Sequence, residues 1–230
     1  MHYAQSIAPT QVAIYNQQGI LFYREERLEQ GMDRFRQGLA IDPQDSNALS
    51  NLGVLLEDAN QRSAAIDHLQ AATNASPDHA TIRYNLGLLL AADGNWLTAE
   101  RSLREATRIA PAWASAYAHL ANTQLHQQQY EAAGQAAEQA LTLAPHNQLA
   151  YYVLLQVYDH QKRGEDLLHT ARTAHELYPD DPAITFYYAL ALHLTEQEEK
   201  ALPLLQEIFF SSSDHVVLHR VAQEILSIVE

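Results

Sequence analysis

Histidines come closest to forming a chemical site in this chain. His215 and His219 stand four residues apart, a spacing that puts both side chains on one helix face and can hold a metal ion. No glutamate of the His-Glu-x-x-His kind and no clear third ligand accompanies them. We therefore interpret them as surface histidines and expect neither a metal nor another cofactor.

Catalytic motifs are absent from the sequence. It contains no glycine-rich phosphate loop, no His-Glu-x-x-His and no Gly-x-Ser-x-Gly. An active site would have to be assembled from scattered acidic residues. We therefore predict that the protein is not an enzyme.

The charge of the chain excludes several classes of partner. Its 230 residues carry a formal net charge of −14, of which −4 falls in residues 1–115 and −10 in residues 116–230. Binding to nucleic acid or to an anionic membrane surface requires an excess of Lys and Arg, so we predict neither. No apolar run reaches the ~18 residues of a membrane span, so we predict no membrane insertion. A basic or weakly charged protein partner suits the C-terminal half.

Features that address a protein to a compartment are few. The first residues, MHYAQSIAPTQ, have neither a basic start nor a continuous apolar stretch, so they do not predict a secretory signal. The absence of cysteine excludes disulfides and thiolate metal sites. A cytoplasmic location is the default expectation.

A period of 34 residues runs through the chain. Six of the eight prolines follow it: Pro9, Pro43, Pro77, Pro111, Pro145 and Pro179. Proline lacks an amide donor and clashes with the preceding helical turn, and it restricts the residue before it. The spacing therefore predicts that one helix ends before each of these prolines and that another begins just after it.

With proline at position 32, six repeats fill residues 12–45, 46–79, 80–113, 114–147, 148–181 and 182–215. Small residues recur at positions 8, 20 and 27, as Gly53, Ala65 and Ala72 do in the second repeat. They allow two helices of about four turns each to pack closely across a polar hinge such as Asp93-Gly94-Asn95. One hairpin cannot bury its apolar face alone, so successive hairpins must stack.

This pattern resembles the tetratricopeptide repeat over residues 12–215, most closely in the first four repeats. The resemblance implies an all-α, right-handed solenoid of about six helix-turn-helix repeats. Leu155 and Leu167 replace small residues in the fifth repeat, so we expect its two helices to lie further apart. Pro203 falls inside the second helix of the sixth repeat, where we expect a late start or a kink.

Both ends of the repeat array differ from its interior. Residues 216–230 have a wide apolar arc and predict a seventh helix that caps the sixth repeat. Alternatively, that apolar surface docks a partner or a second copy of the chain. Residues 1–11 predict a partial helix or turn that resembles the end of a preceding second helix.

The resemblance also implies a concave groove, lined by the first helix of each repeat, in which an extended partner segment lies. Aromatic residues on that surface would anchor the partner, and amides would bind its backbone. The residues expected to contact it are Asn16, Ile20, Tyr23, Asn51, Val54, Tyr84, Asn85, Leu88, Asn122, Leu125, Tyr152, Gln156 and Phe186. Alternatively, individual aromatics pack against neighbouring helices, and Asn51 and Asn85 bond their own scaffold.

Two special binding modes are open to a groove of this kind. The carboxylate clamp, by which some tetratricopeptide proteins grip the C-terminal acid of heat-shock chaperones, needs cations that Asn16 and Thr81 replace here. We therefore predict that the partner is not a chaperone tail. His126 and His160 share position 13 of adjacent repeats, and if they lie side by side they would make binding sensitive to pH.

Two functions compete at this point. The first is a non-catalytic adaptor that binds a partner segment in its concave groove. The second is a structural scaffold or assembly factor that acts through its ends and outer face, and that self-associates through residues 216–230 or through the N-terminal edge.

Overall fold

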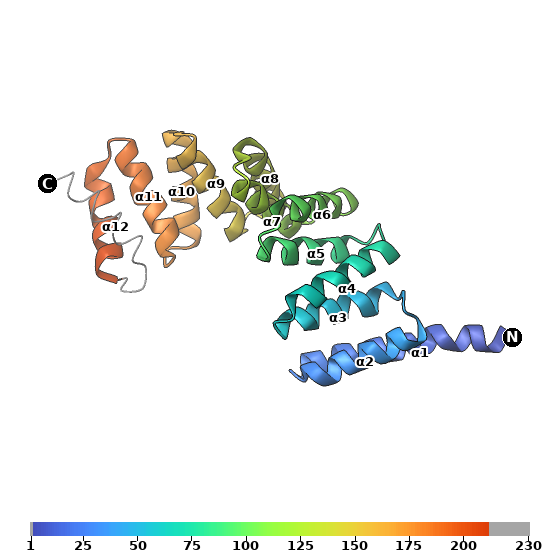
Figure 1. The fold of residues 1–230 in the computed structure, drawn as a ribbon. Helices are drawn as coiled ribbons and strands as arrows, with labels where there is room; N and C mark the ends of the chain where they lie inside the picture. The colour runs from blue at the N-terminus through green and yellow to red at the C-terminus, as the bar shows by residue number, and fades with distance from the viewer. Residues whose placement is uncertain (1, 212–230) are drawn as a thin grey trace. The chain divides into compact units, whose positions relative to one another are not determined.

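The computed structural model describes residues 2–211, and within this range the chain forms twelve α-helices (Figure 1). The helices are α1 (His2–Arg24), α2 (Leu28–Ile41), α3 (Ser46–Asp58), α4 (Arg62–Ala75), α5 (Ala80–Ala92), α6 (Trp96–Ile109), α7 (Ala114–His126), α8 (Tyr130–Leu143), α9 (Gln148–His160), α10 (Gly164–Leu177), α11 (Pro182–Leu194) and α12 (Glu198–Ser211). No strand occurs in this range, and the predicted all-α solenoid is confirmed. The predicted helix 216–230 and the pair His215 and His219 lie outside the described residues.

The helix bounds repeat with the period of the sequence. From α3 onward, each odd-numbered helix begins at position 1 of its repeat, and each even-numbered helix begins at position 17. α12 follows the same rule, because it begins at Glu198, so the late start expected from Pro203 does not occur. Pro203 lies inside α12 instead.

Three of the turns between repeats are stabilised by the residue two places after the proline. Asp45, Asn147 and Asp181 stand there, and each side chain accepts a hydrogen bond from a first-turn amide of the following helix. After Pro9 that place holds Gln11, a poor capping residue. The prediction that a helix ends before Pro9 is wrong: α1 runs through it. Proline removes one helical hydrogen bond but does not by itself end a helix, and Pro203 likewise lies inside α12.

The hinges between paired helices share one backbone conformation. Position 15 has a positive φ in all six repeats, at Glu26, Asn60, Gly94, Gln128, Lys162 and Glu196. The amide of the next residue donates to the carbonyl of position 11, as Gln61 does to Leu56 at 2.8 Å. This is the Schellman geometry, which favours glycine at the left-handed residue. Only Gly94 follows that preference.

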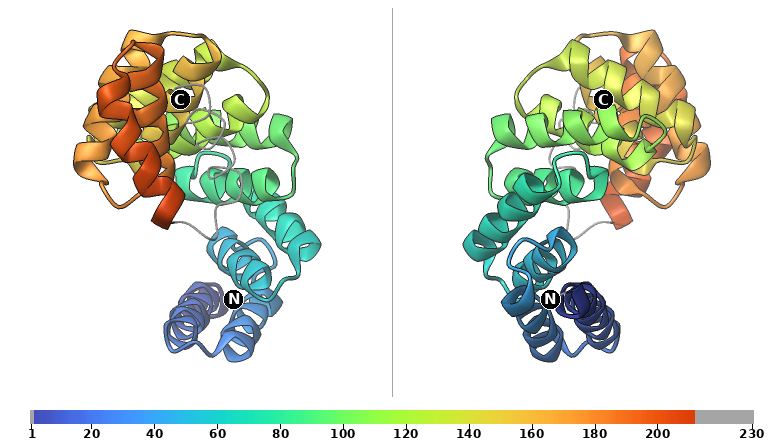
Figure 2. Two further views of the ribbon diagram at one scale, coloured as in Figure 1. Left: turned by 90° about the vertical axis from the view of Figure 1, so that its left-hand side faces the viewer. Right: turned by 90° about the vertical axis from the view of Figure 1, so that its right-hand side faces the viewer.

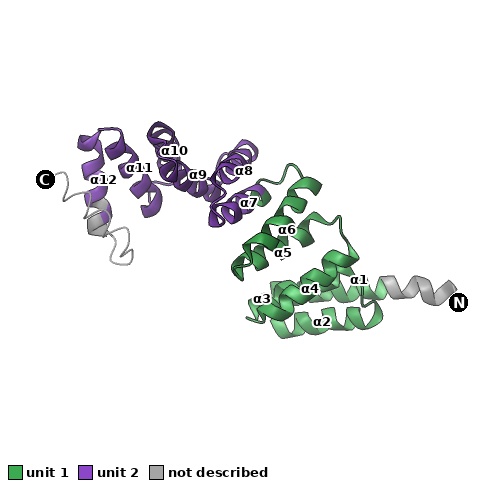
Figure 3. Ribbon diagram, turned by 45° about the horizontal axis from the view of Figure 1, so that its top comes forward, with its two compact units in different colours: residues 1–116 green, residues 117–230 purple. Residues whose placement is uncertain are grey.

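Two compact units are distinguished by their internal contacts, residues 1–116 and residues 117–230 (Figure 3). Within each unit, neighbouring helices pack side by side, as views from two further sides also show (Figure 2). Met32, Phe35 and Leu69 are fully buried in the core of the first unit, and Leu205 and Ile208 in that of the second.

Small residues decide how closely the paired helices approach. A Cβ atom added at Gly53 would lie 2.9 Å from Leu69 Cγ, and one at Gly87 would lie 2.6 Å from Leu103 Cγ. In the fifth repeat Leu155 and Leu167 are fully buried instead. The backbones of α9 and α10 accordingly lie close together over less of their length than those of α3 and α4.

Candidate partner-binding site

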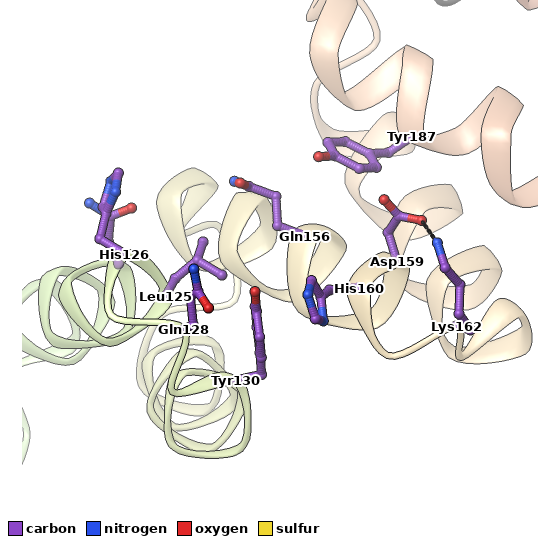
Figure 4. A pocket seen from close by; sticks show the side chains of 10 residues that line it. Leu125, His126, Gln128, Tyr130, Gln156, Asp159, His160, Lys162 and Tyr187 are labelled. Atoms are coloured by element: carbon purple, nitrogen blue, oxygen red, sulfur yellow. Dashed lines mark hydrogen bonds and ion pairs between the residues drawn. The ribbon is translucent and has the colours of Figure 1, made fainter.

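An open hollow in the second unit forms where the first helices of its repeats end (Figure 4). Its volume is about 840 Å³. The ends of α7 and α9, the hinges that follow them, the start of α8 and one residue of α11 provide its walls. The lining residues are Asn122, Leu125, His126, Gln128, Tyr130, Gln156, Asp159, His160, Lys162 and Tyr187. We name it the unit 2 hollow.

Amide side chains dominate the chemistry of the unit 2 hollow. Those of Asn122 and Gln128 form no hydrogen bond with any described residue. The Gln156 amide nitrogen donates to the Tyr152 carbonyl at 3.3 Å, and the Gln156 carbonyl oxygen makes no bond to the described part of the chain. An amide both donates and accepts, as a peptide backbone does. The hollow therefore presents both donors and acceptors of hydrogen bonds to solvent.

Aromatic and charged groups complete the walls. The rings of Tyr130 and His160 stack with their centroids 3.7 Å apart. Lys162 Nζ lies 3.4 Å from Asp159 Oδ1, the contact drawn in Figure 4. Burial, together with the carboxylate of Asp159, raises the pKa of the Tyr187 hydroxyl. Tyr187 therefore stays protonated and can donate a hydrogen bond.

The histidines at position 13 both reach this hollow but not each other. Figure 4 shows His126 on one side and His160 on the other, with Leu125 and Gln128 between them. His160 contacts Tyr130 instead. The side-by-side pair that the repeat register allowed is therefore not formed.

A smaller hollow in the first unit has a different character. It has a volume of about 270 Å³ and lies between α3, α4 and α5, where Val54, Leu69, Leu88 and Leu89 give it apolar walls. Asn85 also lines it. We name it the unit 1 hollow.

Acidic side chains stand at the edge of the unit 1 hollow. Arg62 Nη2 lies 2.8 Å from Glu57 Oε1, so the Glu57 carboxylate is neutralised. Arg62 Nη1 also donates to the Ala92 carbonyl at 3.3 Å. Asp58 forms no ion pair with the described residues. A hydrogen bond with Asp58 raises the pKa of the Tyr23 hydroxyl. The edge therefore carries net negative charge beside an apolar surface.

The structure divides the residues predicted from the register into two groups. Six line the hollows: Val54, Asn85 and Leu88 in the first unit, and Asn122, Leu125 and Gln156 in the second. The others lie elsewhere. Ile20 and Asn51 are partly buried, Tyr23 is 38% exposed, and Phe186 is 8% exposed within the core of the second unit.

Position 5 has a structural use in alternate repeats. Asn16 Nδ2 donates to Asp45 Oδ1 at 2.9 Å, and the Tyr152 hydroxyl donates to the Asp181 carboxylate. Tyr84 packs on Trp113 with ring centroids 4.4 Å apart. Each pair joins residues 29 positions apart, from position 5 to position 34 of one repeat. These side chains therefore tie a first helix to the last residue of the same repeat, which directly precedes the next first helix.

Several lining residues were missed by the reasoning from sequence. Gln128, Tyr130 and Lys162 belong to hinges or to the start of a second helix, which the position rule for first helices does not cover. Tyr187 stands at position 6 of the last repeat. The one available signal is the run Gln127-Gln128-Gln129-Tyr130, an amide-rich hinge that ends in an aromatic residue.

Family models for the tetratricopeptide repeat match residues 51–114 and residues 114–147. The chain is a tetratricopeptide repeat protein. Among curated proteins, no sequence matches it.

Solved structures of tetratricopeptide proteins share this fold over most of the chain. PilF of Pseudomonas aeruginosa superposes with a TM-score of 0.81 at 15% identity, over 95% of this chain and 99% of that one. PilW, described as a type IV pilus biogenesis factor, gives 0.75 at 14% identity, over 92% and 98%. YrrB, described as having an unusual peptide-binding site, gives 0.71 at 18% identity, over 83% and 97%. At these identities the likeness shows the fold alone.

Two further findings concern metals and membranes. Within residues 2–211, no group of three or more His, Asp or Glu side chains is arranged to hold a metal ion. The helices in that range also include none with the length and apolar character that crossing a bilayer requires.

Proposed function

We propose that the protein is a non-catalytic adaptor that holds an extended segment of a partner protein in the unit 2 hollow. One observation carries the proposal: Asn122, Leu125 and Gln156, which the repeat register assigns to the inner surface, all line one open hollow of about 840 Å³. Ligand sites are typically concave, with a few polar groups that converge on the ligand. This hollow is concave and has such polar groups in Asn122, Gln128 and Gln156, although its lining as a whole is more polar than that of a typical small-molecule site.

The chemistry of the walls fits an extended segment better than a helix. An extended backbone has unpaired N–H and C=O groups, whereas a helix has already used its own. The amides of Asn122, Gln128 and Gln156 complement such groups, and Tyr130 and Tyr187 supply aromatic contact area. Lys162 is paired with Asp159, so this cation is a poor ligand for a chain-terminal carboxylate.

The unit 1 hollow adds a second contact of a different kind. About 270 Å³ of apolar space accommodates one or two side chains rather than a drug-sized ligand. Asp58 at its edge favours a basic residue next to the apolar one. A net charge of −14 favours the same partner.

Both the family and one structural relative support this function. Tetratricopeptide solenoids present extended binding surfaces along their stacked repeats. YrrB, which shares the fold, is described as having a peptide-binding site. Asn16 and Phe186 are buried, so the proposed surface does not include them.

A crosslinking pulldown from native extract tests the proposal. Replacing Asn122 and Gln156 together by Ala removes two hydrogen-bonding groups, each worth about 1 kcal/mol, so capture should fall roughly tenfold or more. Gln139→Ala is the matched control, because Gln139 is an exposed amide on α8 that lines neither hollow. Equal capture by the double variant and the control, with unchanged circular dichroism, would rule the hollow out.

An assembly factor that acts through its ends is the second candidate. Two observations favour it. PilW, described as a type IV pilus biogenesis factor, shares the fold over 92% of this chain, and the outer edge of α1 exposes Ile14 and Leu21. In this case the hollow variants would leave capture unchanged, while substitutions on that edge would abolish it.

A further inference from the structure

One edge of α1 exposes apolar side chains. The residues at the same repeat positions in other first helices are buried. Ile14 is 51% exposed and Leu21 is 55% exposed. Gln17, also exposed, stands between them. Spacings of three, four and seven residues put the three side chains on one helix face. We name these residues the α1 stripe.

Other repeats show what normally covers this stripe. At the position of Ile14 they carry Ala48, Ile82, Ala150 and Ile184, all at most 1% exposed. At the position of Leu21 they carry Leu55, Leu89, Val157 and Ala191, all at most 5% exposed. In each of these repeats the preceding even-numbered helix packs against the first helix: α2 on α3, α4 on α5, α8 on α9 and α10 on α11. The α1 stripe is therefore shaped to pack against a helix.

Residues 2–9 do not supply that helix. The repeat register assigns them to a preceding second helix, but they continue α1 through Pro9 (Figure 1). A continuous helix advances about 1.5 Å per residue, so it carries these residues along the axis and away from Ile14 and Leu21. Covering the stripe requires a helix other than α1.

The stripe is complementary to a second copy of itself. In an antiparallel pair of α1 helices with a two-fold axis between Gln17 and Gln18, Ile14 of each copy lies opposite Leu21 of the other. Contacts in a symmetric dimer are reciprocal in this way. Gln17 and its copy meet near the axis, where two amides can bond each other.

Charge also favours a second copy at this edge. α1 contains no Asp or Glu, although the chain has a net charge of −14. Its one arginine, Arg24, lies at the far end of the helix, so antiparallel pairing keeps the two copies of Arg24 apart. Two acidic molecules that meet at the α1 edge therefore avoid repulsion between carboxylates of their α1 helices.

We propose that two copies of this chain associate through the α1 stripe, with their α1 helices antiparallel. The contact is small, and small contacts are weak and transient, so we expect a dissociation constant on the order of 100 µM. It lies on a different surface from the two hollows and does not depend on them.

Sedimentation equilibrium tests the association. Between about 10 µM and about 1 mM, a range that brackets the expected constant, the unmodified chain should pass from monomer to dimer. Leu21→Glu should remain monomeric over the whole range, because pairing would bury a carboxylate against Ile14. Leu97→Glu is the matched control: Leu97 is 58% exposed on α6, away from the stripe, so dimerisation should persist.

Cysteine crosslinking tests the geometry, because the chain has no cysteine of its own. Gln17→Cys should form a disulfide-linked dimer on mild oxidation, and Leu97→Cys should not. A mixture of Ile14→Cys and Leu21→Cys should give the mixed disulfide, since antiparallel pairing opposes these positions, and neither variant should crosslink with itself.

Three results would overturn the proposal. The first is a chain that stays monomeric at the highest concentration and whose Gln17→Cys variant crosslinks no more than the Leu97→Cys variant. The α1 stripe would then be covered by another protein or remain exposed. The second is a dimer that survives Leu21→Glu. The third is self-crosslinking of Ile14→Cys, which would indicate parallel helices.

Discussion

The hydroxyl of Tyr152 donates a hydrogen bond to the carboxylate of Asp181, 29 residues further along the chain. The same carboxylate accepts from the backbone amides of Ala183 and Ile184, each at 3.0 Å, and from Gln148 Nε2 at 2.8 Å. One side chain therefore caps α11 and binds two side chains of α9. Burial and this carboxylate together raise the pKa of the Tyr152 hydroxyl.

Replacing Asp181 should destabilise the second unit more than loss of a cap alone. Asp181→Ala removes the cap, worth about 1 kcal/mol, and leaves Tyr152 and Gln148 without an acceptor, so we expect a total loss of about 2–3 kcal/mol. Tyr152→Phe should cost about 1 kcal/mol. Urea unfolding followed by circular dichroism measures both.

A double-mutant cycle separates this coupling from general damage. Because the two side chains share one bond, the combined variant should be more stable than the sum of the single losses predicts. Asp180→Ala is the control, since the exposed Asp180 makes no bond with any described residue. Strictly additive losses would show that the bond contributes nothing in solution.

The glycines at position 8 should be harder to replace than other helical glycines. Gly87→Ala would press a methyl group against Leu103 Cγ, and the overpacking should cost about 1–2 kcal/mol net of the better helix propensity of Ala. Gly134→Ala on α8 is the matched control, because its Cβ would lie 3.6 Å from Val157 Cγ1. It should gain about 0.5 kcal/mol. Thermal unfolding of both variants measures these changes in stability. A Gly87→Ala variant more stable than the unmodified chain would disprove the close approach between Gly87 and Leu103.

Alkaline pH should weaken the second unit through Tyr158. Its hydroxyl donates to Glu138 Oε1 at 3.0 Å, and burial together with this bond raises its pKa to about 12. Because the folded pKa exceeds the ordinary value of 10.0, the stabilisation is complete below pH 10 and is lost as the pH rises toward 12. The melting temperature of Tyr158→Phe should therefore fall less over this interval than that of the unmodified chain. Parallel curves would contradict the assignment.

Mild acid should act through His119. Burial in α7 lowers its pKa below the ordinary value of 6.5, because the charged imidazolium is poorly solvated there. The unfolded chain then binds the proton more tightly, so the stabilisation is present above pH 6.5 and is lost as the pH falls below it. Melting temperatures at pH 7.5 and 5.5 should differ less for His119→Gln than for the unmodified chain. An unchanged difference would show that His119 titrates normally.

The sequence was sufficient to predict the helical pairs because one residue type sets their ends. Pro43, Pro77, Pro111, Pro145 and Pro179 each follow the end of a helix. Pro9 shows the limit of this rule. A proline makes a break possible, and a capping residue beyond it, such as Asp45 or Asp181, stabilises the start of the next helix, although α5 begins after His79 without a side-chain cap.

The candidate site could be predicted only in part. The repeat register indicates which face of a helix a side chain is on, but not which residues that side chain contacts. It placed Asn122 and Tyr152 on the same inner row, yet Asn122 lines a hollow and Tyr152 binds its own scaffold. What separates them is their place in the repeat: Tyr152 stands at position 5, beside the carboxylate at position 34, whereas Asn122 stands at position 9. Comparing positions 5 and 34 as a pair would have revealed this use in the first, third and fifth repeats.

The left-handed hinge residues have a consequence for how such a protein could change its ligands. Gln128 and Lys162 occupy position 15, where the surrounding hydrogen bonds impose a left-handed backbone and where Glu, Asn, Gly, Gln and Lys all occur in this chain. Both also line the unit 2 hollow. Mutations at these two places therefore alter what the wall offers while the helices keep their lengths and packing. In an evolving lineage, recognition is free to diversify at the hinges without placing the architecture at risk.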